Sequence, residues 1–400
     1  MVGLLLLALV SACAAPGGGG TSHTPTPTPS ASASVSSTTA PPPSPTATAA
    51  PSAAPSGAPS TVASCTGPIP TSANLVLGTL TGSTTVVLRD ITNLSSAITR
   101  CTFAGTIAPR FATSSVVGWA QSGPDIGSPG QINRLDLAAA TVTTPASWPS
   151  GGFGVGNFDW SPNGSALTYI APTSSGSSWH LLAGGHDQVL ANLPAVPGRG
   201  VSREDDDWML AFSPDGLYIA LVETFATGGS GDSSPVQVRR ASDGSLVYSA
   251  SSGTMGVWAS VPSRLFFRSS AGVVSRWDPS DGVSVMQSGL KWVRPHASSD
   301  GRWIAYTSYD SAGHPGVHLY SVQGNSLGPS PTGLRSGALF LNNNLLWYQE
   351  ETPCDCGLGG QSQLTGNSFL YDIGGSAESG SRISGVFDVW PRVTAPPGLG

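Results

Sequence analysis

Two histidines have the spacing of a metal-binding pair. His314 and His318 lie four residues apart, a separation that places two imidazole rings on one face of a helix. Pro315 and Gly316 stand between them and oppose helix formation, and the residues around His318 alternate as in a strand. We therefore expect one turn residue and one strand residue here, and we predict neither a metal site nor a cofactor.

An acidic run is a second candidate for ion binding. The Glu-Asp-Asp-Asp segment at residues 204–207 is the densest cluster of charge in the chain, and carboxylate oxygens are ligands for calcium. The alternating acids and the glycine of a calcium-binding loop are missing from it. A solvated loop is therefore the favoured interpretation.

Two glycine-containing segments match functional motifs in their letters only. Residues 324–328, with Ser326 at the centre, fit the nucleophile-elbow pattern, which requires a strand before it and a helix after it. Pro329 follows this segment, so a turn is expected instead. Residues 152–156 lack the strand and helix that frame a dinucleotide-binding loop. The sequence thus supplies no catalytic residue, and we expect a protein that is not an enzyme.

Some aromatic residues are candidates for a ligand surface. Trp179, His180 and Trp208 lie near predicted connections, and aromatic side chains are enriched at interfaces. The tryptophans that fall inside strand patterns are expected to pack in the core, namely Trp160, Trp258, Trp303 and Trp347.

The composition limits which elements position these residues. Among 400 residues, 51 are glycine and 34 are proline, which suits many short strands and excludes an all-helical bundle. Lys and Arg number 17 against 23 Asp and Glu, and Lys291 is the sole lysine. The chain therefore has no basic surface for DNA or RNA. We predict an all-β protein that does not bind nucleic acid.

The first residues resemble a bacterial lipoprotein signal peptide. An apolar run ends in Val-Ser-Ala at residues 10–12, followed by Cys13. The resemblance implies that residues 1–12 are removed and that a lipid is attached to Cys13; residues 1–3 lack the usual Lys or Arg. An ordinary signal peptide and a membrane-spanning helix are the alternatives, although the run is shorter than the roughly 20 residues of a span.

Residues 13–64 are predicted to be a disordered tether that begins at the lipidated cysteine. Between residues 14 and 64, only His23, Val35 and Val62 are not Ala, Ser, Thr, Pro or Gly, so the segment cannot bury a core. A polyproline-like chain of this length reaches on the order of 100 Å. We expect it to hold a domain at residues 65–398 on the outer face of a bacterial cytoplasmic membrane or in the envelope.

The four remaining cysteines indicate an oxidising compartment because their number is even. Three pairings are possible, and we favour Cys65 with Cys101 and Cys354 with Cys356. A redox pair or half of a metal site at residues 354–356 is the alternative.

A recurring turn organises the rest of the chain. The segments at residues 158–164, 210–216 and 296–301 each end in Asn-Gly or Asp-Gly and are followed by an apolar strand. Proline presets such a turn, Asp or Asn caps it, and glycine supplies the positive φ. Each segment predicts a β-hairpin, with turn residues Pro162, Asn163, Gly164, Pro214, Asp215, Gly216, Asp300 and Gly301.

The spacing of these turns matches the blades of a β-propeller, which are 40 to 50 residues long. Weaker copies lie near residues 109–119, 257–268 and 337–348. A strand at residues 385–390 fits the first strand of a blade whose other strands are at 75–77, 86–90 and 98–103. We predict seven blades of four antiparallel strands, with six as the alternative, closed by pairing of the N- and C-terminal strands.

The repeats at residues 212–220 and 300–305 resemble those of TolB-type, WD-like β-propellers of bacterial envelopes. The resemblance implies a periplasmic or surface-exposed propeller that works through protein partners. We predict a binding or scaffolding module for an envelope protein or a cell-wall polymer, with loops on one face of a rigid disc as the binding surface. A propeller hydrolase or lyase with a site at the central channel is the alternative.

Overall fold

The computed structural model describes the chain from residue 62 to residue 391, within the second of two units into which the chain divides, residues 57–400. The described ranges are 62–104, 109–122, 129–149, 157–173, 176–194, 207–224, 236–251, 253–259, 262–269, 272–354 and 361–391. Cys13, the signal peptide and residues 13–61 of the predicted tether lie outside these ranges. The side chains of Asp207, Trp208 and Cys354 are not described either.

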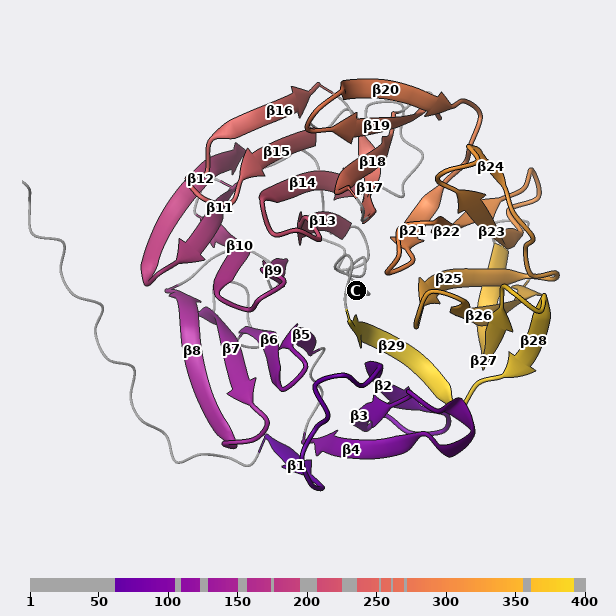
Figure 1. The fold of residues 1–400 in the computed structure, drawn as a ribbon, viewed down its shortest axis with the longest axis horizontal. Helices are drawn as coiled ribbons and strands as arrows, with labels where there is room; N and C mark the ends of the chain where they lie inside the picture. Colours follow the sequence, from indigo (N-terminus) through magenta and orange to yellow (C-terminus); the bar gives the residue numbers. More distant parts are fainter. Residues whose placement is uncertain are drawn as a thin grey trace, which may run out of the picture. The chain divides into compact units, whose positions relative to one another are not determined.

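Seven antiparallel sheets surround a common centre and form the blades of a propeller (Figure 1). Blade 1 joins the two ends of the described chain and contains β1 (Ala63–Cys65), β2 (Leu75–Leu80), β3 (Val86–Asp90), β4 (Ile98–Phe103) and β29 (Ile383–Trp390), with a short 3-10 helix, η1 (Leu94–Ser96), before β4. Blade 2 contains β5 (Arg110–Thr113), β6 (Val116–Ser122), β7 (Gly130–Asp136) and β8 (Thr141–Trp148). Blade 3 contains β9 (Phe158–Trp160), β10 (Ala166–Thr173), β11 (Gly176–Ala183) and β12 (His186–Pro194).

The remaining four blades follow in chain order around the ring. Blade 4 contains β13 (Asp207–Phe212), β14 (Tyr218–Thr224), β15 (Val236–Arg240) and β16 (Leu246–Ala250). Blade 5 contains β17 (Thr254–Ala259), β18 (Arg264–Arg268), β19 (Val274–Asp278) and β20 (Gly282–Gln287). Blade 6 contains β21 (Val293–Ala297), β22 (Trp303–Tyr309), β23 (Pro315–Ser321) and β24 (Ser326–Leu327). Blade 7 contains β25 (Arg335–Phe340), β26 (Leu345–Cys354), β27 (Gln361–Asp372) and β28 (Ala377–Gly380).

The ring closes where the two ends of the described chain meet. The C-terminal strand β29 pairs with β2, so that Leu75 lies opposite Trp390, and the two strands lie side by side at the bottom of Figure 1. This confirms the predicted closure and the seven blades, and the alternative of six was wrong. Blade 1 also has a fifth strand, β1, which pairs with the outer edge of β4. We did not predict this strand.

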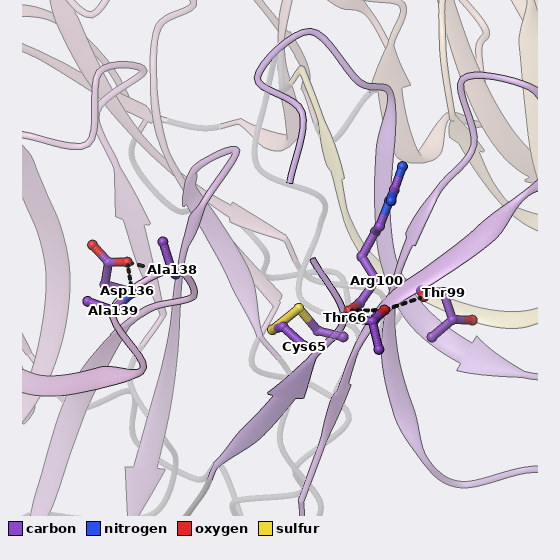
Figure 2. Close-up of a disulfide and its surroundings, with 8 residues drawn as sticks. Cys65, Thr66, Thr99, Arg100, Asp136, Ala138 and Ala139 are labelled. Carbon is purple, nitrogen blue, oxygen red and sulfur yellow. Dashed lines mark hydrogen bonds between the residues drawn. A yellow bond between two sulfur atoms is a disulfide. The ribbon is translucent and has the colours of Figure 1, made fainter. Parts of the chain in front are cut away.

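The predicted disulfide between Cys65 and Cys101 is present, and it fixes this fifth strand to the blade. Cys65 and Cys101 lie opposite each other in β1 and β4, with their Cα atoms 4.0 Å apart (Figure 2). The backbone is tied on both sides of the bond, because the Thr66 N–H donates to the Arg100 carbonyl and the Ala104 N–H donates to the Val62 carbonyl, each over 2.8 Å. The first strand, which begins at Ala63, thus belongs firmly to the propeller.

The repeated turns connect the first and second strands of blades 3, 4 and 6. Gly164, Gly216 and Gly301 have φ values of 68°, 72° and 67°, a region that side chains with a Cβ rarely adopt. A serine before each turn completes it. The Ser213 hydroxyl donates to Asp215 Oδ1 over 2.6 Å and accepts from the Tyr218 N–H over 2.9 Å. The same bonds recur at Ser161 and Ser298, which the sequence analysis did not single out.

The hydrophobic core is divided among the joints between blades. Seven clusters of buried side chains are present in the described part of the chain, and each combines residues of two neighbouring blades. Burial falls from the centre outward, since every residue of the inner strand β17 is buried whereas every residue of the outer strand β28 is exposed. Apolar area removed from water at each joint therefore holds the ring together.

Candidate functional site

Three buried polar side chains lie on the inner strands and contact the next blade. Asp388 Oδ2 accepts the Phe111 N–H over 2.7 Å, which joins blade 1 to blade 2. Asp159 Oδ2 accepts the Phe212 N–H over 2.7 Å, which joins blade 3 to blade 4. These side chains lie at the centre of the ring, where the alternative hypothesis placed catalytic acids. Their carboxyl groups are at most 1% exposed and bind backbone, so they hold blades together.

His296 makes the third contact of this kind, between blades 6 and 7. Its Nδ1 atom accepts the Phe340 N–H over 3.1 Å, so the neutral ring carries its proton on Nε2. Burial lowers the pKa of His296 to about 4, which keeps the ring neutral at physiological pH. The Nε2 atom is buried and has no hydrogen-bond partner among the described residues. His296 is therefore an uncharged joint residue whose protonation would remove the acceptor of Phe340.

A set of four polar residues on blade 3 has the composition of a nucleophile and its base. Ser178 Oγ lies 2.7 Å from His180 Nε2, and His180 Nδ1 lies 3.1 Å from Asp187 Oδ2. The Tyr169 hydroxyl donates to Asp187 over 2.7 Å, and its ring stacks on the His180 ring with centroids 4.7 Å apart. We call these residues the Ser178 cluster. The sequence analysis singled out only His180 among them.

Electrostatics favours an ionised Asp187 in this cluster. Burial alone would raise the pKa of Asp187, but hydrogen bonds from His180 and Tyr169 outweigh burial and lower it. The pKa of Tyr169 is raised, first by burial and then by Asp187. An ionised Asp187 orients the Nδ1–H of His180 toward itself, which leaves Nε2 free to accept from the Ser178 hydroxyl.

The exposure of the Ser178 cluster runs opposite to that of a catalytic triad. In such triads the nucleophile faces the substrate and the acid is buried. Here Ser178 is 7% exposed, whereas the Asp187 side chain is 42% exposed. The serine lies within the sheet, since it pairs with Ala171 of β10 on one side and with Asn192 of β12 on the other. The arrangement ties three strands together and presents its acid, not its nucleophile, to solvent.

Ser178 is therefore expected to resist serine-directed reagents. A fluorophosphonate probe incubated with the folded protein should give no adduct on the tryptic peptide that contains Ser178, because a hydroxyl inside a sheet cannot reach the phosphorus centre. Mass spectrometry of the digest measures this. The S178A variant gives the background, and a chymotrypsin sample shows that the probe is active. An adduct on Ser178 in the native protein would support the hydrolase alternative.

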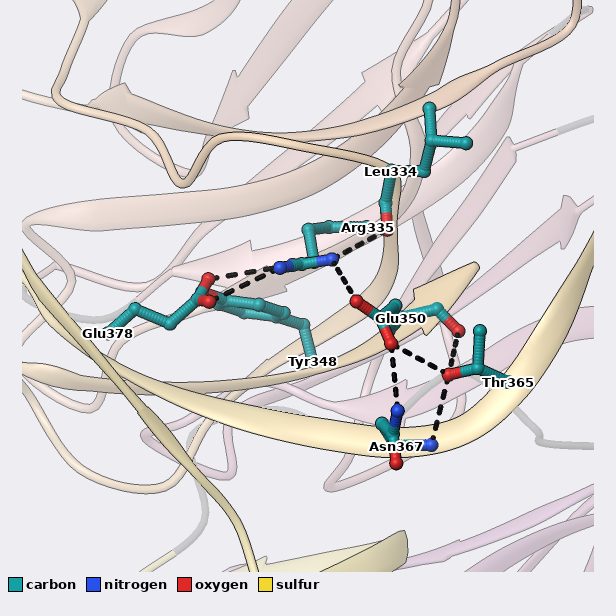
Figure 3. A network of polar contacts seen from close by, with 7 residues as sticks. All are labelled: Leu334, Arg335, Tyr348, Glu350, Thr365, Asn367 and Glu378. Carbon is teal, nitrogen blue, oxygen red and sulfur yellow. Dashed lines mark hydrogen bonds and ion pairs between the residues drawn. The ribbon is translucent and has the colours of Figure 1, made fainter. Parts of the chain in front are cut away.

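A second polar cluster lies in blade 7, toward blade 6, and is drawn in Figure 3. Arg335 lies between two carboxylates, with Nη1 3.1 Å from Glu350 Oε1 and Nη2 3.2 Å from Glu378 Oε1. Its guanidinium stands 4.5 Å from the centre of the Phe369 ring. The Tyr348 hydroxyl donates to Glu378. We call this group, with Thr365 and Asn367, the Arg335 cluster.

The Arg335 cluster is internally paired and anionic. Hydrogen bonds from Asn367 and Thr365, followed by the charge of Arg335, lower the pKa of Glu350. Burial and then Glu378 raise the pKa of Tyr348. The side chains of Glu350 and Glu378 are 26% and 32% exposed. One cation between two carboxylates leaves a net negative charge that faces solvent, which suits contact with a polar or cationic partner more than proton transfer.

The structure places the other residues singled out from the sequence apart from these clusters. His318 lies in β23 and His314 in the connection before it, as predicted, and no group of three or more His, Cys, Asp or Glu in the described ranges is arranged to hold a metal. Residues 324–328 form a turn and the short strand β24. The prediction that Trp179 lines a ligand surface was wrong, because its side chain is fully buried between blades 3 and 4.

Several predictions fall on residues whose structure is not described. These are residues 204–206, residues 152–156, Cys356, and the side chains of Asp207, Trp208 and Cys354. The pairing of Cys354 with Cys356 stays a prediction. No helix in the described part of the chain is long and apolar enough to cross a bilayer.

The clusters that the sequence analysis missed had only weak signals. Phe-Asp occurs in two apolar inner strands, at residues 158–159 and 387–388, and an acid in such a strand indicates a buried contact. Ser178 and His180 lie two residues apart on one side of β11, but their partner Asp187 lies in β12, after a turn. The pattern within one strand therefore does not show all three residues. Arg335 and Glu378 are 43 residues apart, so the fold alone brings them together.

Comparisons with known proteins show likeness in fold only. No family model matches the chain, and no curated protein matches its sequence. Among solved structures, TolB from Acinetobacter baumannii is 14% identical over 64% of this chain and 62% of its own, with a TM-score of 0.41. The β-propeller domain of the Trilobed protease from Pyrococcus furiosus is 9% identical over 68% of this chain and 81% of its own, with a TM-score of 0.46.

A prolyl endopeptidase structure is 13% identical over 77% of this chain and 48% of its own, with a TM-score of 0.49. The chain thus spans less than two thirds of the TolB chain and about half of the endopeptidase. The assignment of the propeller rests on the strand topology of this protein itself.

Proposed function

We propose that this protein is an exported propeller, anchored to the membrane by a lipid on Cys13, that binds an envelope protein or a cell-wall polymer. The observation that carries the proposal is the disulfide between Cys65 and Cys101. Disulfides persist in oxidising compartments outside the cytoplasm. This one lies at the entry of the chain into the propeller, directly after the Pro-, Ser- and Thr-rich segment.

The position of the disulfide also suits a tethered module. Any load on the N-terminal segment enters the propeller through β1, a strand of three residues. The covalent bond transfers that load to β4, which is paired with β3 along its length. A rigid closed ring with one covalently reinforced attachment point is suited to holding a partner at a distance from the membrane.

The proposal contains no catalytic step. The reversed exposure of the Ser178 cluster and the structural use of Asp159, Asp388 and His296 support a binding role. The hydrolase or lyase alternative stays testable through the serine probe described above and through substrate screening.

Replacing Cys13 by Ala is expected to release the protein from the membrane. The wild-type chain should sediment with membranes and incorporate an alkyne-labelled palmitate, because the lipid that carries the acyl chains is proposed to be attached at Cys13 alone, through a thioether. The C13A variant should lose the label and appear in the soluble envelope fraction. Fractionation and in-gel fluorescence measure both effects, and a C354A variant serves as a cysteine control. Equal sedimentation and equal labelling of wild type and C13A would refute the anchor.

Photo-crosslinking locates the binding face. Tyr309 ends β22 and is 41% exposed on the side of the ring where second strands connect to third strands, where Glu351 of blade 7 acts on it electrostatically. Val285 is 69% exposed on the outer strand β20 and serves as the control position. A photoreactive residue at 309 in the full-length anchored protein should capture one reproducible species that position 285 does not. Identical products from both positions, or none from either, would argue against a binding face at the connections.

A further inference from the structure

The third strand of blade 7 is longer than the outer strand that covers it. β27 spans Gln361–Asp372, but β28 pairs only with residues 369–372, and the Ser381 N–H adds one bond to the Ser368 carbonyl. Residues 361–364 pair with residues 351–354 of β26, beyond a bulge, and no described strand pairs with their outer side. We call these two segments the blade 7 arm, and we call the outer side of residues 361–364 the β27 edge.

The alternation of the backbone shows which groups face the β27 edge. The N–H and C=O of one residue point to the same side of a strand, and the side alternates along the strand. The Glu351 N–H donates to the Leu334 carbonyl over 3.0 Å, so it points away from β27. Glu351 and Leu364 are therefore a pair without hydrogen bonds between them, and Leu364 directs its N–H and C=O outward. Ser362, two residues away, does the same.

The β27 edge is exposed, whereas the opposite edge of the arm is blocked. Leu364 is 54% exposed, and residues 363–367 are all exposed. On the opposite edge, Pro353 has no N–H, and the Leu334 carbonyl already accepts a bond. The third strand of blade 6 also extends past its outer strand, but Val317 there is only 1% exposed. The β27 edge carries none of the devices that usually block a sheet edge.

A bulge fixes the direction of the arm. Residues 365–367 of β27 stand against the single residue Glu350 of β26, and Gly366 takes a φ of 82° there. Asn367 Nδ2 and the Thr365 hydroxyl donate to Glu350 Oε2 over 2.9 Å and 3.0 Å (Figure 3). Arg335 holds the other oxygen of Glu350 over 3.1 Å. The β27 edge is therefore already in place, which lowers the entropy cost of adding a strand to it.

A carboxylate without a cation lies beside the β27 edge. Unlike Glu350, Glu351 makes no ion pair with a described residue. Its carboxylate accepts from the Ser362 hydroxyl on the arm itself. Burial and then Glu351 raise the pKa of Tyr309 in blade 6, while Arg294 lowers it. A cationic side chain brought to the β27 edge would thus meet an available negative charge.

The geometry of a sheet places that cation within reach. Leu364 and Glu351 lie opposite each other, so their side chains project to the same side of the arm. A strand added at the β27 edge would lie about 5 Å from β27 and about 10 Å from β26. A Lys or Arg opposite Leu364 covers that distance by laying its aliphatic stem across the leucine.

We infer that the β27 edge binds an extended, basic segment of a partner protein, which continues the sheet of blade 7 where β28 ends. The segment would bond the outward backbone groups of Ser362 and Leu364, and its Lys or Arg would reach Glu351. A second copy of this chain would instead bring a second Glu351 to the edge, and like charges oppose that pairing. The inference rests on the proposed binding role and selects a polypeptide, because a polysaccharide lacks N–H and C=O groups at strand spacing.

Synthetic peptides and the full chain labelled with 15N-leucine test the inference. The basic probe is Ac-Thr-Lys-Val-Lys-Val-Thr-NH2, the acidic probe has Glu in place of Lys, and a third probe is the basic one N-methylated at each Lys and Val. Each is titrated to about 1 mM at constant ionic strength, because an isolated strand binds weakly. The amide signal of Leu364 is assigned by its absence in L364I, and the exposed Leu246 of blade 4 supplies the control signal.

The basic peptide should shift the Leu364 signal along a saturable curve and leave the Leu246 signal in place. L364P should abolish binding, because proline removes the outward N–H, and its Tm should stay within about 2 °C of wild type, since that N–H has no partner to lose. E351Q should weaken binding about fivefold, the size of one exposed ion pair. D281N removes a carboxylate from an exposed turn of blade 5 and should bind as the wild type does.

Three results would overturn the inference. The first is a Leu364 signal that the basic peptide does not move. The second is an equal shift with the acidic or the N-methylated peptide, and the third is a D281N variant that weakens binding as much as E351Q. Photo-crosslinking at position 309 tests the binding role separately. Specific capture there without a shift of Leu364 would reject the β27 edge and leave the proposed function standing.

Discussion

Replacing Asp388 by Ala is expected to lower the free energy of unfolding by about 4 kcal/mol. The side chain is fully buried, and its two oxygens accept the N–H groups of Phe111 over 2.7 Å and of Val389 over 2.9 Å. Truncation leaves both N–H groups without an acceptor inside the core, where each unsatisfied group costs about 1–3 kcal/mol. Urea unfolding followed by tryptophan fluorescence measures the loss.

The effect should be local to the seam that closes the ring. Phe111 and Asp388 are 277 residues apart, so their bond joins the two ends of the propeller, whereas Phe212 and Asp159 are 53 residues apart within continuous chain. Hydrogen exchange of β29 and β2 should therefore accelerate in D388A more than in the matched D159A variant. D388N retains one acceptor oxygen and should lose about half as much stability. A D388A protein as stable as wild type would show that the seam does not depend on this carboxyl group.

Acidification is expected to destabilise the protein through His296. Burial lowers the pKa of His296 to about 4 from an unperturbed value of 6.5. Between these values the unfolded chain binds the proton and the folded protein does not, so stability is complete above pH 6.5 and falls as the pH approaches 4. The shift corresponds to a loss of about 3 kcal/mol over that window.

The H296N variant isolates this contribution. An asparagine oxygen replaces Nδ1 as the acceptor of the Phe340 N–H but cannot take up a proton, so the variant should be less stable at pH 7.5 yet flatter between pH 6.5 and 4. Urea midpoints at pH 7.5, 6.5, 5.5 and 4.5 give both curves. Parallel curves for wild type and H296N would show that other groups carry the acid sensitivity.

The repeated turns explain how much of the fold the sequence predicts. A turn such as Ser213 to Gly216 is specified locally, because the serine, the aspartate and the glycine bond within six residues. Such turns are therefore visible in the sequence as short motifs that recur with a regular spacing. The turns of blades 2, 5 and 7 lack this motif, and only the spacing between blades indicated where they lie. The fifth strand β1 was missed because three residues, Ala63 to Cys65, carry no pattern.

The candidate sites were far less predictable than the fold. Trp179 and His180 are neighbours in the sequence, yet the alternation of β11 buries the tryptophan between blades 3 and 4 and places the histidine beside Ser178 and Asp187. The sequence shows neither which side of a strand faces a neighbouring blade nor what that blade presents there.

The sequence by itself determined the all-β architecture, the number of blades within one and the place of closure, because turns, strand alternation and spacing are properties of adjacent residues. It favoured the pairing of Cys65 with Cys101 among three possible pairings, and the structure decided it. Only the tertiary structure decided which polar groups meet. Asp388 meets Phe111 where blade 1 contacts blade 2, and Arg335 meets Glu378 because the folding of blade 7 brings its first and last strands together. Those contacts join residues that are distant along the chain, so no local pattern in the sequence records them.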